Sequence, residues 1–163
     1  MKAKIIAVGQ KMPAWVQTGF ADYHKRIQPM LPTELVEIAA AKRSKQPSAA
    51  EIEKYANTEG GLILQAHHSA RERLICLDVR GKNWSTEQLA ERVQTAMQDG
   101  EDLAFVIGGA DGLSKHVLAQ AQACWSLSNL TLPHALVRVL IMEQLYRAMT
   151  ILHNHPYHRG DYF

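Results

Sequence analysis

Two short apolar runs constrain the fold of this chain more than any other feature. One is LICLDV at residues 74–79 and the other is LAFVI at residues 103–107. Strands with so little polar alternation are buried on both faces, as in parallel sheets covered by helices. Helical periodicity at residues 12–28, 85–100 and 133–152 supplies the covering layers. The sequence therefore predicts an α/β fold with a mostly parallel sheet flanked by helices.

Weaker patterns complete the predicted order of elements. Further strands are expected at residues 2–9, 34–40 and 127–132, and a short helix is expected from Ser114 to Ala123. A helix over 48–67 is also expected, interrupted at Gly60-Gly61. No linker, internal repeat or low-complexity tract divides the 163 residues, so we expect a single domain over 1–163.

Composition narrows the class of protein. Hydrophobic residues make up 47% and charged residues 21%, which favours a packed core over disorder. No apolar run reaches the roughly 18 residues that span a bilayer, so no membrane partner is expected. Cys76 and Cys124 both lie in apolar strand patterns, which favours reduced, buried thiols and a cytoplasmic location.

The positive charges are clustered although the formal net charge is only +2. The densest cluster, Lys42-Arg43-Ser44-Lys45, falls in a polar loop. Such a basic loop suits a polyanion such as RNA. Charge alone equally fits the solvated face of an ordinary enzyme.

A glycine-rich bend follows the strand at 103–107. It reads Gly108-Gly109-Ala110-Asp111-Gly112, and ligands of open α/β sheets bind outside the carboxyl ends of strands. The spacing is not G-x-G-x-x-G and no Walker lysine follows, which disfavours nicotinamide and nucleoside-triphosphate sites. Taken alone, the bend could equally be a plain turn.

The segment 127–132, Leu-Ser-Asn-Leu-Thr-Leu, has no charges and many backbone groups. It could hold an adenine by main-chain hydrogen bonds and apolar contacts, or it could simply be a core strand. Leu77, at the end of another parallel strand, could close the same pocket or serve only in the core.

The histidines near the C-terminus do not predict a metal site. The spacing His153-x-His155-x-x-His158 is not a helix-face pair, and no Cys or carboxylate accompanies it. No Ser-His-Asp or Cys-His arrangement is evident either. Glu143 and Arg147, four residues apart, predict an ion pair on the last helix.

The last helix carries apolar residues beyond a single stripe. This favours a helix that packs on its own sheet and on a partner subunit, and a central helix of a monomer is the alternative.

Several motifs together resemble one family. They are the bend Ile-Gly-Gly-x-x-Gly-Leu at 107–113, the segment Leu-Thr-Leu-Pro-His at 130–134, and the tail Asn-His-Pro-Tyr-His-Arg at 154–159. With the start Ala7-Val8-Gly9-Gln10-Lys11-Met12-Pro13, they cover nearly the whole chain. The chain resembles the SPOUT class of methyltransferases, and within it the family of ribosomal RNA large subunit methyltransferase H.

This resemblance implies several properties. The fold would contain a C-terminal trefoil knot, and the protein would act as a homodimer on the assembled ribosome. It would use S-adenosyl-L-methionine to methylate N3 of a pseudouridine in 23S rRNA. The implied cofactor contacts are Leu77, Gly108, Leu127, Ser128, Asn129, Leu130, Thr131 and Leu132.

The reaction needs removal of the N3 proton and support for the resulting negative charge. We expect Arg159 or Arg138 to support the anion, His158 or His134 to accept the proton, and Tyr157 to stack on or orient the base. Phosphate contact or structural capping is the alternative role for the tail residues.

Two other functions are compatible with the same residues. One is a SPOUT methyltransferase with another RNA target, and the other is a non-catalytic dimer that binds an adenine ligand or RNA. The chain also extends past the usual family tail by Gly160-Asp161-Tyr162-Phe163, which could alter placement of the tail.

Overall fold

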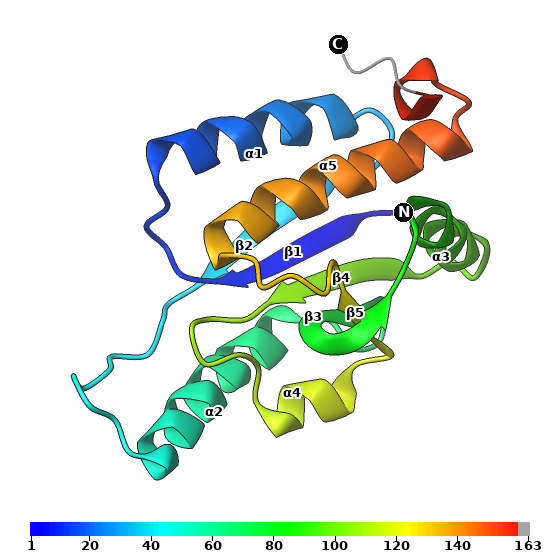
Figure 1. Cartoon of the computed structure of the whole chain (residues 1–163). Helices are drawn as coiled ribbons and strands as arrows, with labels where there is room; N and C mark the ends of the chain where they lie inside the picture. The colour runs from blue at the N-terminus through cyan, green and yellow to red at the C-terminus, as the bar shows by residue number, and fades with distance from the viewer. Residues whose placement is uncertain (160–163) are drawn as a thin grey trace.

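The computed structural model describes residues 1–159 and contains a five-stranded parallel sheet between two helical layers (Figure 1). The strand order is β2-β1-β4-β3-β5, and each of the four neighbouring pairs is parallel. The α/β prediction is thus confirmed. The strands are β1 Ala3–Val8, β2 Thr33–Ile38, β3 Glu72–Asn83, β4 Asp102–Ile107 and β5 Ala123–Ser126. The helices are α1 Ala14–Ile27, α2 Ala49–Ala66, α3 Thr86–Gln98, α4 Lys115–Gln120, α5 His134–Leu152 and the 3-10 helix η1 Pro156–Arg159.

The apolar strands separate two cores because successive side chains of a strand point to opposite faces. Phe105 of β4 packs with α1, α3 and α5 on one face, whereas Val106 packs with α2 and α4 on the other. Figure 1 shows the same division, with α1 and α5 above the sheet and α2 and α4 below it. The absence of polar alternation in β4 is therefore explained by burial on both faces.

The helix α2 is continuous, so the predicted interruption at Gly60-Gly61 is wrong. A Cβ at Gly60 would lie 2.5 Å from Ser114 Oγ and 3.0 Å from Val117 Cγ2. Glycine is thus used here for close packing of α2 against α4. A helical pattern cannot distinguish this role from a break.

The last strand lies earlier in the chain than predicted. β5 ends at Ser126, and α4 ends at Gln120 instead of continuing through Ala123. Strand pairing stops because the Ser126 hydroxyl donates to the Ser128 carbonyl (2.9 Å) and the Leu130 N–H donates to Ser128 Oγ (3.0 Å). Serine competes in this way with sheet ladders. The segment 127–132 is a loop, not a strand.

A bulge in β3 brings its second half back against β5. The register jumps from Leu77–Trp125 to Lys82–Trp125, and a Cβ at Gly81 would lie 2.6 Å from the Cys124 carbonyl. Only glycine fits so close to the neighbouring backbone. The trefoil knot implied by the resemblance stays a prediction.

Candidate functional site

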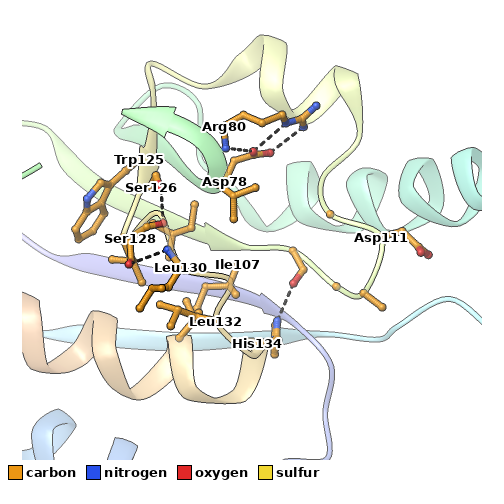
Figure 2. Close-up of a pocket in the computed structure, with 18 residues that line it drawn as sticks. Asp78, Arg80, Ile107, Asp111, Trp125, Ser126, Ser128, Leu130, Leu132 and His134 are labelled. Carbon is orange, nitrogen blue, oxygen red and sulfur yellow. Dashed lines mark hydrogen bonds and ion pairs between the residues drawn. The ribbon is translucent and has the colours of Figure 1, made fainter. Parts of the chain in front are cut away.

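A cavity of about 470 Å³ lies at the carboxyl ends of the central strands (Figure 2). This volume falls within the range typical of small-molecule sites. Three segments form its walls: residues 77–80, where β3 bulges between its two paired parts, the bend 108–112 after β4, and the loop after β5. The position agrees with the rule that ligands bind outside the carboxyl ends of parallel strands.

The glycine bend is tightly folded beside the cavity. Gly109 and Gly112 form an isolated antiparallel bridge, and Gly112 has a φ of 77°, which favours glycine. A Cβ at Gly108 would lie 2.9 Å from Leu113 Cδ2. A larger residue at 108 would therefore displace the bend.

The loop 127–132 supplies a second wall. Leu127, Ser128, Leu130 and Leu132 line the cavity, whereas Asn129 and Thr131 lie in the same loop but not among the lining residues. Within residues 1–159, the backbone N–H groups of Asn129, Thr131 and Leu132 have no hydrogen-bond partner. The loop thus combines apolar side chains with main-chain donors. Leu77 and Gly108 line the same cavity, so six of the eight predicted contacts come together there.

His134, the first residue of α5, lines the cavity, and both of its ring nitrogens form hydrogen bonds. Its Nδ1 lies 2.7 Å from the Gly108 carbonyl oxygen, and Arg138 Nε donates to its Nε2 at 3.2 Å. A guanidinium only donates, so Nε2 accepts and Nδ1 carries the proton that is donated to Gly108. His134 is therefore fixed as the neutral Nδ1–H tautomer.

The pKa of His134 lies below its ordinary value. Burial is the main cause, and the positive charge of Arg138 acts in the same direction, while the hydrogen bond to the Gly108 carbonyl opposes them. Accepting a proton on Nε2 would also break the bond from Arg138. His134 is thus better suited to holding Gly108 than to accepting a proton.

Arg138 lies behind His134 and does not line the cavity. Its residue exposure is 2%, with Nη1 bonded to Glu37 Oε2 (2.6 Å) and Nη2 to the Gly9 carbonyl (2.7 Å). Each end of the guanidinium is thus engaged. The geometry assigns Arg138 to a clamp between β2, the loop after β1 and α5.

The 3-10 helix η1 of the tail follows the C-terminal end of α5 (Figure 1), whereas the cavity is lined by His134 and Val137 at the N-terminal end of α5. Tyr157 is buried, its hydroxyl donates to Glu143 Oε1 (3.1 Å), and its ring packs at a tilt against that of Tyr146, with 4.8 Å between the ring centroids. Tyr146 lies twelve positions after His134 on α5, which corresponds to a rise of about 18 Å. The single chain therefore does not bring Tyr157, His158 or Arg159 to the cavity.

Within the tail, the three predicted residues differ in environment. Burial, together with the nearby Tyr23 and Glu143, raises the pKa of Tyr157. His158 is half-buried with no partner for Nδ1 among residues 1–159, and Arg159 is exposed. The predicted pair of Glu143 and Arg147 is confirmed, with Arg147 Nε donating to Glu143 Oε1 at 2.8 Å. Residues 160–163 lie outside the described part of the chain.

Sequence reasoning missed an ion pair on the cavity wall. Arg80 Nη2 donates to Asp78 Oδ2 at 2.9 Å, and both residues line the cavity (Figure 2). The hydrogen bonds from Arg80 lower the pKa of the Asp78 carboxyl. The signal in the sequence was an Asp-x-Arg motif directly after Leu77, at the carboxyl end of a predicted strand.

In the part of the chain that the structure describes, no group of three or more His, Cys, Asp or Glu residues is placed to hold a metal ion.

The chain matches the family model described as a predicted SPOUT methyltransferase over residues 1–158. The chain belongs to the SPOUT methyltransferase family. A relative from Psychrobacter arcticus named ribosomal RNA large subunit methyltransferase H is 65% identical, covering 99% of this chain and 100% of the relative. A relative of the same name from Acinetobacter baumannii is 55% identical, covering 98% and 100%.

The fold of this SPOUT methyltransferase also resembles a solved structure. The crystal structure of a probable methyltransferase from Bordetella pertussis Tohama I aligns with a TM-score of 0.56 and 16% identity, over 91% of this chain and 94% of the other. At that identity the likeness concerns the fold alone. None of the helices in residues 1–159 has the length and apolar character needed to cross a membrane.

Proposed function

We propose that this protein transfers a methyl group from S-adenosyl-L-methionine to ribosomal RNA of the large subunit. The observation that carries the proposal is the cavity, built from the glycine bend and the loop 127–132 at the carboxyl edge of the sheet. Family membership and the names of the relatives support the same activity. When bound, the cofactor supplies an activated methyl group on a sulfonium.

The lining residues fit the chemistry of that cofactor. Leu77, Leu130, Leu132 and Val137 offer apolar contacts for a flat base. The main-chain N–H groups of the loop 127–132 offer donors to the ring nitrogens, and the Asp78 carboxylate offers a partner for an ammonium group. Gly108, which has no side chain, would let the backbone of the bend approach the cofactor.

The finer proposal is methylation at N3 of a pseudouridine in 23S rRNA, on the assembled ribosome. The N3 atom carries a proton that must leave before its lone pair can react. Of the two candidate bases we favour His158, because Nε2 of His134 already accepts from Arg138. Nδ1 of His158 is buried without a partner within residues 1–159, so Nε2 is the ring nitrogen that would take the proton. Arg159, which is exposed, would stabilise the negative charge that develops on the base.

Arg138 and Tyr157 take supporting roles in this proposal. The guanidinium of Arg138 is committed to Glu37, to the backbone and to His134, so it positions Gly108 through His134. Tyr157 anchors the tail on α5 through its hydrogen bond to Glu143. This anchoring role replaces the stacking role that the sequence suggested for Tyr157.

The proposed reaction requires a homodimer, because it needs tail residues and a cavity that are far apart within one chain. The tail and the cavity of one chain lie at opposite ends of α5, so His158 and Arg159 would reach the cavity of a second copy. Several half-buried apolar residues of α5, among them Leu136, Val139 and Leu140, are available for such a contact. The proposed setting is the cytoplasm, where ribosomes are found.

The test uses labelled methyl transfer with the purified full chain. Assembled ribosomes should be methylated at one 23S position, located by nuclease mapping, and naked RNA fragments should be far poorer acceptors. Labelling of transfer RNA or of a ribose hydroxyl would support a different RNA target instead. Binding of the cofactor without any transfer would support the non-catalytic alternative.

The proton acceptor is tested by single-turnover rates at saturating cofactor. His158→Ala should slow the chemical step by about 10²–10⁴-fold, the usual range for removal of a general base. If His158→Ala retains the wild-type rate, His158 is not the proton acceptor.

A further inference from the structure

A buried carboxylate lies beneath the glycine bend, outside the cavity. Glu59 of α2 is 1% exposed, and its Oε2 accepts the N–H of Ala41 at 2.9 Å. Its Oε1 has no hydrogen-bond partner among residues 1–159. A Cβ at Gly109 would lie 3.1 Å from this oxygen, so the bend rests directly on Glu59. A carboxylate buried in this way requires a nearby cation to stay charged.

Arg43 supplies that cation and also binds Asp111 of the glycine bend. Its Nε donates to Asp111 Oδ2 at 2.8 Å, and its Nη2 lies 2.7 Å from the same oxygen and 3.5 Å from Glu59 Oε2. Asp111 belongs to the bend, and its carboxylate points away from the cavity (Figure 2). Arg43 thus bridges the bend to α2 from outside the site.

The bend needs such an outside support. It contains three glycines within five residues, 108–112, and glycine gives the backbone more conformational freedom than other residues. A wall that is ordered only when a ligand binds weakens affinity, because the ordering entropy is lost at that moment. One hydrogen bond from Arg43 Nε and the ion-pair contact of Arg43 Nη2 fix the position of Asp111 in advance.

We propose that Arg43 is a positioning residue for the methyl-donor pocket, holding Asp111 of the glycine bend against its buried anchor Glu59. This inference rests on the proposed function, in which the cavity binds S-adenosyl-L-methionine. It also revises the role of the basic loop 42–45. Arg43 serves the pocket, and Lys42 and Lys45 remain for contacts with RNA phosphates.

The test measures donor binding by calorimetry in the absence of RNA, with S-adenosylhomocysteine as the probe. Arg43→Ala and Asp111→Asn should each raise the dissociation constant on the order of tenfold, and the double variant should be little worse than either, as for two residues that act as one unit. Arg43→Lys, which keeps the charge but lacks the Nε–H that donates to Asp111, should give a dissociation constant between those of the wild type and Arg43→Ala. Lys54→Ala, on the exposed side of α2, removes one positive charge as a matched control and should bind like the wild type.

Two further measurements separate positioning from a general drop in stability. In single-turnover assays Arg43→Lys should raise the donor concentration needed for half-maximal rate while leaving the saturating rate unchanged. Amide hydrogen exchange at residues 109–112 should be faster in Arg43→Ala than in Lys54→Ala. Exchange rates in the other regions should be the same in both variants. The proposal would be overturned if Arg43→Ala had the same exchange rates at 109–112 as Lys54→Ala. It would also be overturned if the two variants bound the donor with equal affinity.

If the proposed function is wrong, the experiments give a different result from the one expected if only the role of Arg43 is wrong. If the wild-type protein gives no heat with the probe, the assignment of the cavity to this donor fails. The hydrogen-exchange measurement still tests the role of Arg43, because it measures how well ordered the glycine bend is in the absence of any ligand.

Discussion

His134 illustrates how neighbouring groups decide what a residue can do. By sequence, His134 and His158 are alternative proton acceptors, because histidine can accept a proton near neutral pH. The contacts of His134 to Gly108 and Arg138 instead fix one tautomer and occupy the lone pair that would take the proton. The same residue type in the tail, His158, has one ring nitrogen without a partner among residues 1–159. Two histidines that the sequence treated alike therefore have different environments, and this difference is the basis for proposing His158 as the proton acceptor.

The lowered pKa of His134 predicts how stability depends on pH. The unfolded chain protonates this residue near pH 6.5, whereas the folded chain does so only at lower pH. Its contribution to the free energy of unfolding is thus fully present above about pH 6.5 and is lost as the pH falls toward the lowered pKa. Urea unfolding at about pH 7.5 and about pH 5.5 should show a smaller loss for His134→Gln than for the wild type. Equal losses in the two proteins would mean that His134 is not held neutral.

At the scale of elements, packing decided details that local patterns left open. Gly60 and Gly61 have the same sequence signature, but only Gly60 faces α4. The loop 127–132 has the composition of a strand, yet the hydrogen bonds of Ser128 turn the chain there and end its pairing with the sheet. The carboxyl edge of the sheet, in contrast, followed from the order of strands and helices.

The two adjacent glycines of α2 give a matched test of helix packing. Gly60→Ala should lower the free energy of unfolding by about 1–3 kcal/mol, because the new Cβ collides with Ser114. Gly61→Ala meets nothing within 4 Å and should raise it by about 0.5–1 kcal/mol through helix propensity. Denaturant titration of both variants checks the pair, and a stable Gly60→Ala would show that α4 moves away at little cost.

The basic loop predicts a salt-dependent interaction with RNA. The double variant Lys42→Glu/Lys45→Glu should weaken ribosome binding and reduce the slope of log affinity against log salt by about one for each phosphate that is no longer neutralised. Binding measured over a range of salt concentrations gives the slope, and Lys54→Glu serves as the control for charge reversal elsewhere. An unchanged slope would remove the loop from the RNA-binding surface.

At the scale of the whole molecule, the separation of cavity and tail makes a second copy necessary for the proposed chemistry. The long helix α5 fixes that separation, with His134 at its first turn and the anchor of Tyr157 near its end. Neither end can approach the other without breaking the helix. The protein is therefore expected to work as a dimer with two composite sites.

Mixed dimers test this arrangement. A cavity variant, Leu132→Glu, and a tail variant, Arg159→Ala, should each be inactive alone. After mixing at equal amounts, about a quarter of the sites should combine an intact cavity with an intact tail, so activity should return to roughly that level. Methyl transfer to ribosomes measures the recovery. No recovery, despite subunit exchange shown by mass spectrometry, would mean that each tail serves its own chain.

The sequence by itself determined the layered α/β fold and the edge of the sheet where the cavity lies, because both follow from periodicity and from the order of strands and helices. It also placed the glycine bend 108–112 at that edge, because the bend directly follows the buried strand at 103–107. The segment 127–132, which the sequence predicted as a strand, lines the cavity as a loop because β5 ends at Ser126 and the chain turns there. Only the tertiary structure decided the contacts between distant segments. Arg43 meets Asp111 across 68 positions, and Arg138 meets Glu37 across 101. Such pairs leave no local pattern, because they depend on which helix faces which loop once the two cores have packed.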